Sequence, residues 1–147
     1  MTLPDNADVI DLLVHQHHEV KRALAEVDGL EGESKVAAFA RLQKLLAAHE
    51  NGELRVVHPA VRDLAKAPDI ARDRMNEEER ADAAIDELQA LGVGHPDFDA
   101  KFDAFRDAVL AHAEQEETLE FPRLRATVSQ ERLQLLADEL RSVQAMR

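Results

Sequence analysis

The sequence predicts an all-α protein: an antiparallel, up-down four-helix bundle with a short additional C-terminal helix. Three observations indicate this fold. The 147 residues are rich in Ala and Leu and include only five Gly and five Pro, a composition that favours helices. No stretch alternates apolar and polar residues in the pattern of a strand. Four long helical stretches follow one another with short connections, which favours antiparallel packing.

The first two helices are delimited by glycine, serine and proline. The first is expected over about 7–28, because Gly29 suits the C-terminal end of a helix. The second is expected over about 34–57, with Ser34 as its N-cap. Pro59 is expected to end it, because proline disfavours the helical conformation in the residue before it.

The remaining three helices follow the same reasoning. The third is expected over about 69–91, and the fourth over about 97–120, where Pro122 would end it. Ser129 can cap a shorter helix over about 129–144. We expect a single domain over residues 1–147, with the bundle occupying about 7–121.

Composition and charge exclude several classes of function. The chain has 18 Lys and Arg against 30 Asp and Glu, a formal net charge of −12, which disfavours nucleic acid and anionic membranes as partners. The absence of Cys excludes thiolate metal sites and cysteine nucleophiles. The N-terminus has neither a basic start nor an apolar run. We therefore expect a cytoplasmic protein.

Histidines and glutamates interrupt the apolar stripes of the predicted helices. His49 and Glu53 lie on the inward stripe of the second helix, and His112 and Glu116 lie on that of the fourth. Residues four apart sit one above the other on a helix face, so each pair can reach one centre. A carboxylate buried without a partner costs several kcal/mol, so these pairs require compensation.

Protons or a metal are the available compensation. His17 lies on the first helix's stripe and Glu78 on the third's, and of the basic residues only Arg74 is near them. Imidazole with carboxylate and without thiolate suits iron, manganese or zinc. For His17 alone, a hydrogen-bonded core histidine is the more common case. Glu78 lies in an acidic run that could equally be a solvated face.

A repeat supports a shared site. Residues 49–59 and 112–122 both read His-x₃-Glu-x₅-Pro, which predicts a pseudo-twofold centre in which each half supplies one ligand pair to one of two ions. His58 and Phe121 occupy equivalent positions before the prolines. We interpret them as a surface histidine and a core phenylalanine.

These segments, with the run from Asp8 to His17, resemble the hemerythrin family, specifically its bacterial hemerythrin-like HHE cation-binding domains, over about residues 8–124. The resemblance implies a non-haem di-iron centre with oxo- or hydroxo-bridged ions; manganese or zinc is the lesser expectation. It also implies that the two glutamates bridge the ions. The ligands implied by the family motifs are His17, His49, Glu53, His112 and Glu116.

The sequence departs from the family on the third helix, where no histidine occurs between His58 and His95. Glu78 stands where that ligand is expected, and Glu50 is a lesser alternative; otherwise one ion keeps an open or water-filled position. An added carboxylate favours ferric iron, and so peroxide handling, redox turnover or sensing over oxygen carriage.

Four hypotheses of function follow. The leading one is a di-iron carrier or sensor that binds oxygen or a related small molecule. The others are a redox enzyme acting on peroxide or nitric oxide, an iron store or sensor, and a metal-free structural bundle. A ferritin-like site is excluded because Leu46 and Val109, not glutamates, lie three residues before His49 and His112. No His-Glu-x-x-His zinc-protease motif occurs, and the oligomeric state is left open.

Overall fold

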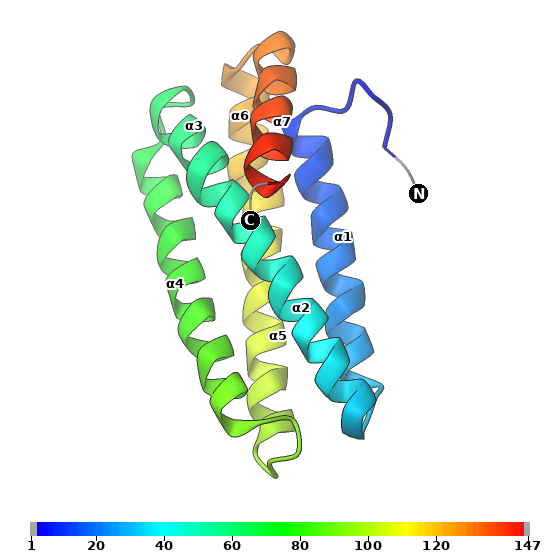
Figure 1. Cartoon of the computed structure of the whole chain (residues 1–147). Helices are drawn as coiled ribbons and strands as arrows, with labels where there is room; N and C mark the ends of the chain where they lie inside the picture. The colour runs from blue at the N-terminus through cyan, green and yellow to red at the C-terminus, as the bar shows by residue number, and fades with distance from the viewer. Residues whose placement is uncertain (1–2, 146–147) are drawn as a thin grey trace.

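A computed structural model describes residues 3–145 and confirms the all-α fold class. Four long helices lie antiparallel and side by side (Figure 1). No strand occurs among the described residues. The bundle helices are α1 (Val9–Asp28), α2 (Gly32–Gly52), α4 (Pro68–Leu91) and α5 (Phe98–Gln115), and α7 (Gln130–Ala145) is the additional C-terminal helix.

The helix termini differ in detail from those expected. Gly29 closes α1 as predicted, and Ser129 accepts a hydrogen bond from the Arg132 amide at the start of α7. Ser34 does not cap α2, because that helix already begins at Gly32. An interaction between Asp8 and Asp11 caps α1, and each side chain accepts a hydrogen bond from the other's backbone amide.

The predicted helix ends before the two prolines are wrong, because both helices continue through a π-helical turn. From α2 the chain passes through η1 (Glu53–Val57) into α3 (His58–Asp63). From α5 it passes through η2 (Glu116–Glu120) into α6 (Phe121–Thr127).

The π turns explain why proline does not end these helices. In each, an amide bonds to the carbonyl five residues earlier, from His58 to Glu53 and from Phe121 to Glu116. The wider turn moves the carbonyls that a proline ring would otherwise meet. Pro59 and Pro122 then lie in the first turn of the following α-helix, where no amide hydrogen is required.

Two apolar clusters flank a polar layer in the middle of the bundle. One cluster includes Leu13 and Val61 and joins α1, α3, α6 and α7, and the other includes Leu42 and Phe102 and joins the four long helices at the opposite end. Along α1, the segment between the clusters contains His17. The buried polar residues therefore lie in a layer with an apolar core on each side.

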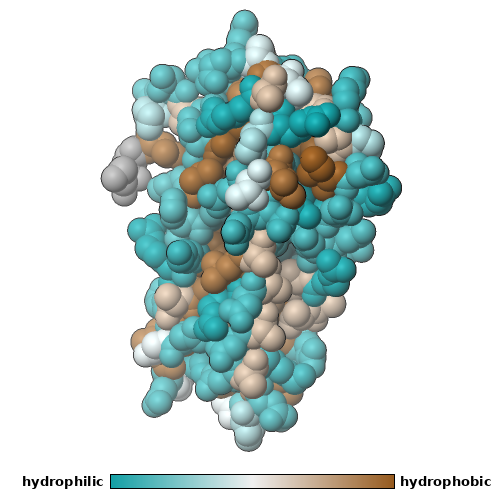
Figure 2. All heavy atoms as spheres, turned by 180° about the vertical axis from the view of Figure 1, so that it is seen from behind, coloured by the Kyte–Doolittle hydropathy of each residue, from teal (hydrophilic) through white to brown (hydrophobic). Residues whose placement is uncertain are grey.

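Figure 2 shows the face opposite to the one seen in Figure 1. Most of this face is hydrophilic, with hydrophobic side chains between the polar ones. Among residues 3–145, no helix is sufficiently long and apolar to cross a membrane.

Candidate metal centre

The polar layer brings together four histidines and three glutamates from every long helix of the bundle. All are buried except His112, which retains a side-chain exposure of 15%. The set is His17 of α1, His49 of α2, Glu53 of η1, His58 of α3, Glu78 of α4, His112 of α5 and Glu116 of η2.

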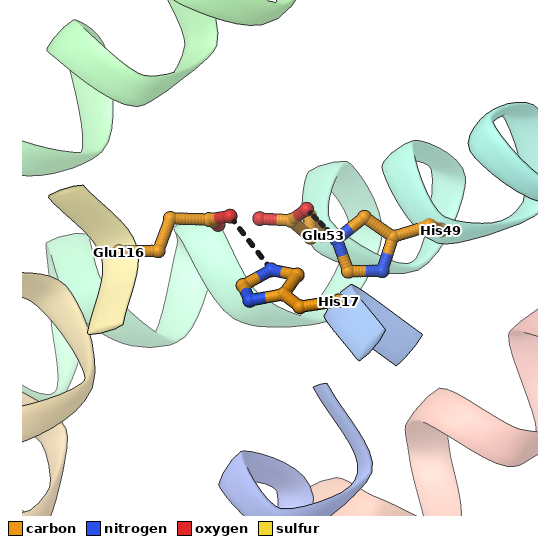
Figure 3. Close-up of side chains that lie close together, drawn as sticks. All are labelled: His17, His49, Glu53 and Glu116. Carbon is orange, nitrogen blue, oxygen red and sulfur yellow. Dashed lines mark hydrogen bonds and ion pairs between the residues drawn. The ribbon is translucent and has the colours of Figure 1, made fainter. Parts of the chain in front are cut away.

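One group of four ligand atoms joins α1 to both π turns. His17, His49, Glu53 and Glu116 each offer one atom within 4.8 Å of the others. His49 Nε2 lies 2.5 Å from Glu53 Oε1, and His17 Nε2 lies 3.2 Å from Glu116 Oε1. The four side chains point toward one another (Figure 3).

A second group shares both glutamates with the first. Glu53, His58, Glu78 and Glu116 also offer atoms within 4.8 Å of one another. His58 Nε2 lies 2.8 Å from Glu78 Oε1. His112 Nε2 lies 3.3 Å from Glu78 Oε1 and 3.3 Å from Glu116 Oε1, which places this imidazole beside the same group.

All six residues singled out in the sequence lie in this layer, and His58 joins them. The interpretation of His58 as a surface residue is wrong, since it is only 2% exposed. The extra residue of a π turn rotates the following side chains by about 100°, which turns His58 inward. Phe121 is buried, as expected.

The sequence alternative Glu50 lies at the edge of the layer. Among the described residues it is a member of neither four-atom group. Burial, together with the facing carboxyl group of Asp82, raises the pKa of Glu50 to about 10. Glu50 lines the groove between α2 and α4.

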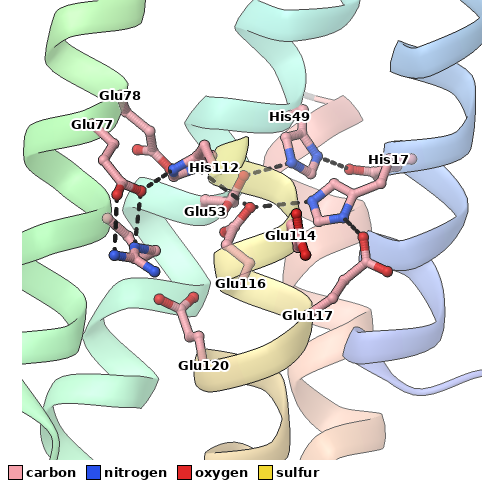
Figure 4. Close-up of polar contacts among 12 residues, drawn as sticks. His17, His49, Glu53, Glu77, Glu78, His112, Glu114, Glu116, Glu117 and Glu120 are labelled. Atoms are coloured by element: carbon pink, nitrogen blue, oxygen red, sulfur yellow. Dashed lines mark hydrogen bonds and ion pairs between the residues drawn. The ribbon is translucent and has the colours of Figure 1, made fainter. Parts of the chain in front are cut away.

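Each imidazole directs its second nitrogen toward an acceptor outside the layer. Figure 4 shows these contacts for His17 and His112. The Nδ1 distances are 2.8 Å for His17 to Glu117, 2.8 Å for His49 to the Gln16 side-chain oxygen, 2.8 Å for His112 to Glu77, and 3.6 Å for His58 to Glu120. Carboxylate and amide oxygens accept hydrogen bonds, so Nδ1 carries the hydrogen in His17, His49 and His112. The Nε2 atom of each of these three imidazoles is thereby left free for metal ligation. His58 Nδ1 makes no hydrogen bond at its longer distance from Glu120.

Comparison with known proteins identifies the family. The family model for the hemerythrin HHE cation binding domain matches residues 8–124. The chain belongs to this family. It is therefore a cation-binding helical protein, and the resemblance seen in the sequence is confirmed.

Two similar proteins place the HHE domain in context. A crystal structure of a hemerythrin HHE cation binding domain-containing protein from Mycobacterium kansasii superposes with a TM-score of 0.85 at 18% identity, covering 95% of this chain and 86% of that one. This likeness shows a shared fold. A protein named "DNA nickase" from Nostoc sp. (strain PCC 7120 / SAG 25.82 / UTEX 2576) is 23% identical over 139 residues. The match covers 94% of this chain but spans only 39% of that relative's length.

The unpaired atoms of the HHE domain fit a bound cation. Oε2 of Glu53 and Oε2 of Glu116 are buried without a hydrogen-bond partner among residues 3–145. Buried polar atoms are normally paired, and an unpaired carboxylate oxygen is costly. At 2.5 Å, His49 Nε2 and Glu53 Oε1 share a proton, which a cation bound beside both atoms would replace. This all-nitrogen and oxygen donor set suits iron, manganese or zinc.

The pKa shifts show that protons occupy the centre when no metal does. Burial acts to raise the pKa of Glu53, but the facing imidazoles, His49 foremost, outweigh it and hold that pKa below its usual range. Burial acts to lower the pKa of His58, but the carboxylates of Glu120 and Glu78 outweigh it and raise that pKa to about 10. The Glu53 carboxylate therefore stays ionised and the His58 imidazole protonated, and a metal ion would displace that proton.

A small cavity adjoins the centre. About 40 Å³ is open to the centre of a water molecule, and one water needs about 10–15 Å³ of such space, so the cavity admits a molecule of a few atoms. Its walls include every residue of the centre except His58, together with apolar side chains such as Val20 and Val109. Leu46, Glu50, Glu78 and Ala81 line both this cavity and the groove between α2 and α4.

Proposed function

We propose that this HHE domain holds two iron ions in its polar layer and binds oxygen or a related small molecule in the adjoining cavity, as a carrier or sensor. The observation that carries the proposal is the pair of four-atom ligand groups that share Glu53 and Glu116. Two carboxylates common to both groups suit bridging of two ions.

The geometry of the two groups supports a ligand assignment. His17 and His49 would hold one ion, and His58 and Glu78 the other, with His112 in reach of the second group. Two iron ions, when bound, supply redox chemistry and a coordination position for a small molecule. The chain's own contribution is to fix the imidazoles from outside and to exclude bulk water with two apolar clusters.

One observation favours peroxide handling as a second candidate function. Glu78 is buried in the layer, where it adds a third carboxylate to the two that are shared. An added carboxylate donor favours the ferric state, and so redox turnover of peroxide or nitric oxide. We propose no action on nucleic acid, because a formal net charge of −12 opposes binding to phosphates.

Metal analysis of aerobically purified protein tests the proposal. We expect two irons per chain and an absorption spectrum with oxo-to-iron charge-transfer bands. Reversible bleaching on removal of oxygen would identify a carrier, and rapid gas evolution from added peroxide would identify turnover. Protein that takes up no iron when refolded or incubated with Fe²⁺ would contradict the proposal.

Filling the cavity tests whether the small molecule enters there. Ala81 lines the cavity and is half-buried on α4, whereas Ala83 is exposed on the same helix. We expect Ala81→Leu to slow the reaction of the iron-loaded protein with oxygen or peroxide at least about tenfold, which corresponds to about 1.4 kcal/mol. Iron content should stay the same, because Ala81 supplies no ligand. Ala83→Leu is the matched control, and equal rates in the two variants would exclude this cavity.

A further inference from the structure

The C-terminal helix α7, which lies beyond the residues matched by the family model, reaches the polar layer through one side chain. Gln144 of α7 and Gln16 of α1 exchange two hydrogen bonds through their amide groups, of 2.8 and 2.9 Å. The oxygen of Gln16 also accepts a hydrogen bond of 2.8 Å from His49 Nδ1. A continuous chain of contacts therefore joins α7 to an imidazole of the centre.

The partner of His49 differs in kind from those of the other three imidazoles. The other histidines face carboxylates: those of Glu117 and Glu77 accept hydrogen bonds from His17 and His112, and that of Glu120 lies 3.6 Å from His58 Nδ1. Gln16 carries both an oxygen and an NH₂ group. If the NH₂ group faced His49, it would donate to Nδ1 and leave the hydrogen on Nε2, so that His49 could not bind a metal through the nitrogen that faces the centre. The orientation of the Gln16 amide therefore decides whether His49 can be a ligand.

Gln144 fixes that orientation. Its NH₂ group lies 3.4 Å from the backbone oxygen of Ala48, which can only accept, and 2.9 Å from the oxygen of Gln16. Rotating the Gln16 amide by half a turn would set two NH₂ groups against each other and two oxygens against each other. The Ala48 carbonyl thus orients Gln144, Gln144 orients Gln16, and Gln16 places the hydrogen on His49 Nδ1.

Gly52 gives α7 the room that this chain of contacts needs. A Cβ atom at position 52 would lie 2.5 Å from Leu140 Cδ1 and 2.7 Å from Gln144 Nε2. The other half of the repeat has Gln115 at the equivalent position. Since α7 packs against α1, α2 and η1, a glycine on this half of the pseudo-twofold centre leaves the ends of the Leu140 and Gln144 side chains in place.

We propose that Gln144 is a positioning residue for the metal centre, which selects the metal-binding tautomer of His49 through Gln16 and makes α7 part of the ligand framework. This inference rests on the proposed metal-binding role of His49. It extends the functional unit past the matched family domain into the C-terminal helix.

The test compares Gln144→Leu in two backgrounds. In the natural sequence, the substitution frees the Gln16 amide to rotate. We therefore expect the affinity for one of the two Fe²⁺ ions to fall about tenfold or more, which is the usual effect of removing a residue that orients a metal ligand. In a Gln16→Glu background, a carboxylate faces His49 and has no NH₂ group to present. There, Gln144→Leu should leave Fe²⁺ affinity unchanged.

Fe²⁺ affinity is measured by anaerobic competition with a chelator, and far-ultraviolet circular dichroism reports the helical content. Gln134→Leu is the matched control, because Gln134 is a half-buried amide of α7 that bonds to the Asn6 backbone oxygen, away from the centre. If Gln144→Leu lowers the Fe²⁺ affinity equally in the natural sequence and in the Gln16→Glu background, Gln144 contributes only to packing. That result would overturn the inference.

The remaining outcomes separate this inference from the proposed function. Two Fe²⁺ ions bound to the natural sequence, with unchanged affinity in Gln144→Leu, would overturn the positioning role alone. No Fe²⁺ binding by the natural sequence would overturn the proposed function and the positioning role together.

Discussion

We expect Glu53→Gln to remove both proposed metal ions and His58→Ala to remove one. Glu53 is fully buried and belongs to both four-atom groups, while His58 belongs to only one. The amide keeps the shape of the side chain but has one oxygen and no charge, so it can neither bridge two ions nor neutralise them. Elemental analysis should give close to zero iron per chain for Glu53→Gln and about one for His58→Ala.

The control for this pair is Glu50→Gln, which removes a neighbouring acid that belongs to neither group among the described residues. It should retain two irons per chain. Retention of two irons by Glu53→Gln, with helical content unchanged, would contradict the shared-ligand assignment. Loss of iron in Glu50→Gln would instead identify Glu50 as a ligand, which from the sequence is the lesser alternative to Glu78.

The centre was largely predictable because its ligand pairs obey helical periodicity. His49 with Glu53 and His112 with Glu116 are spaced four apart on stripes that are otherwise apolar. That pattern places a charge in a core, and a core cannot hold such a charge without compensation. Helical periodicity also predicts the fold class. That prediction depends on the apolar stripes of the helices and on the short connections between them, and does not require precise helix ends.

His58 and the π turns were missed because the periodicity rule assumes 3.6 residues per turn throughout. One extra residue in η1 moves His58 by about 100°, from the expected surface position into the layer. The proline six residues after each glutamate was the available signal, since apolar residues such as Val61 and Leu124 continue the helical pattern beyond it. A helix that continues past a proline requires an irregular turn before it.

The outer partners were not predictable from one sequence. Glu117 and Glu77 bond to histidines on other helices, and Gln16 joins α1 to α2 and α7. No fixed spacing connects such residues, because their contacts depend on how the helices pack. Figure 4 shows Glu77 beside His112 and Glu117 beside His17, at the edge of the predicted ligands. The sequence therefore indicates the candidate ligands but not the residues that surround them.

Removing the metal should make stability strongly dependent on pH. The pKa of His58 in the folded, metal-free protein is raised to about 10 by Glu120 and Glu78, against the opposing effect of burial. The pKa of an unfolded histidine is about 6.5. The stabilisation from the protonated imidazole is therefore fully present below about pH 6.5 and is lost as the pH rises toward 10. The pKa of His112 is also raised, so its contribution to stability is likewise lost as the pH rises.

The expected loss is measurable by thermal unfolding in excess chelator. Between pH 6.5 and 9, the His58 contribution falls by about 3 kcal/mol, at about 1.4 kcal/mol per pH unit, which lowers Tm by about 10 °C. His58→Gln should flatten this dependence, whereas His95→Ala, in an exposed loop, should leave it intact. If the Tm of His58→Gln falls with rising pH as steeply as that of the natural sequence, the pH dependence comes from other groups.

The metal-loaded protein should show the opposite trend. Ligand imidazoles must give up a proton to bind a cation, so metal affinity rises with pH over the same range in which the metal-free protein weakens. At metal concentrations about a thousandfold above Kd, two sites contribute about 8 kcal/mol, or about 25 °C in Tm. The Tm difference between loaded and metal-free protein should therefore widen from pH 6.5 to pH 9. A constant difference would mean that the cation does not replace protons on these imidazoles.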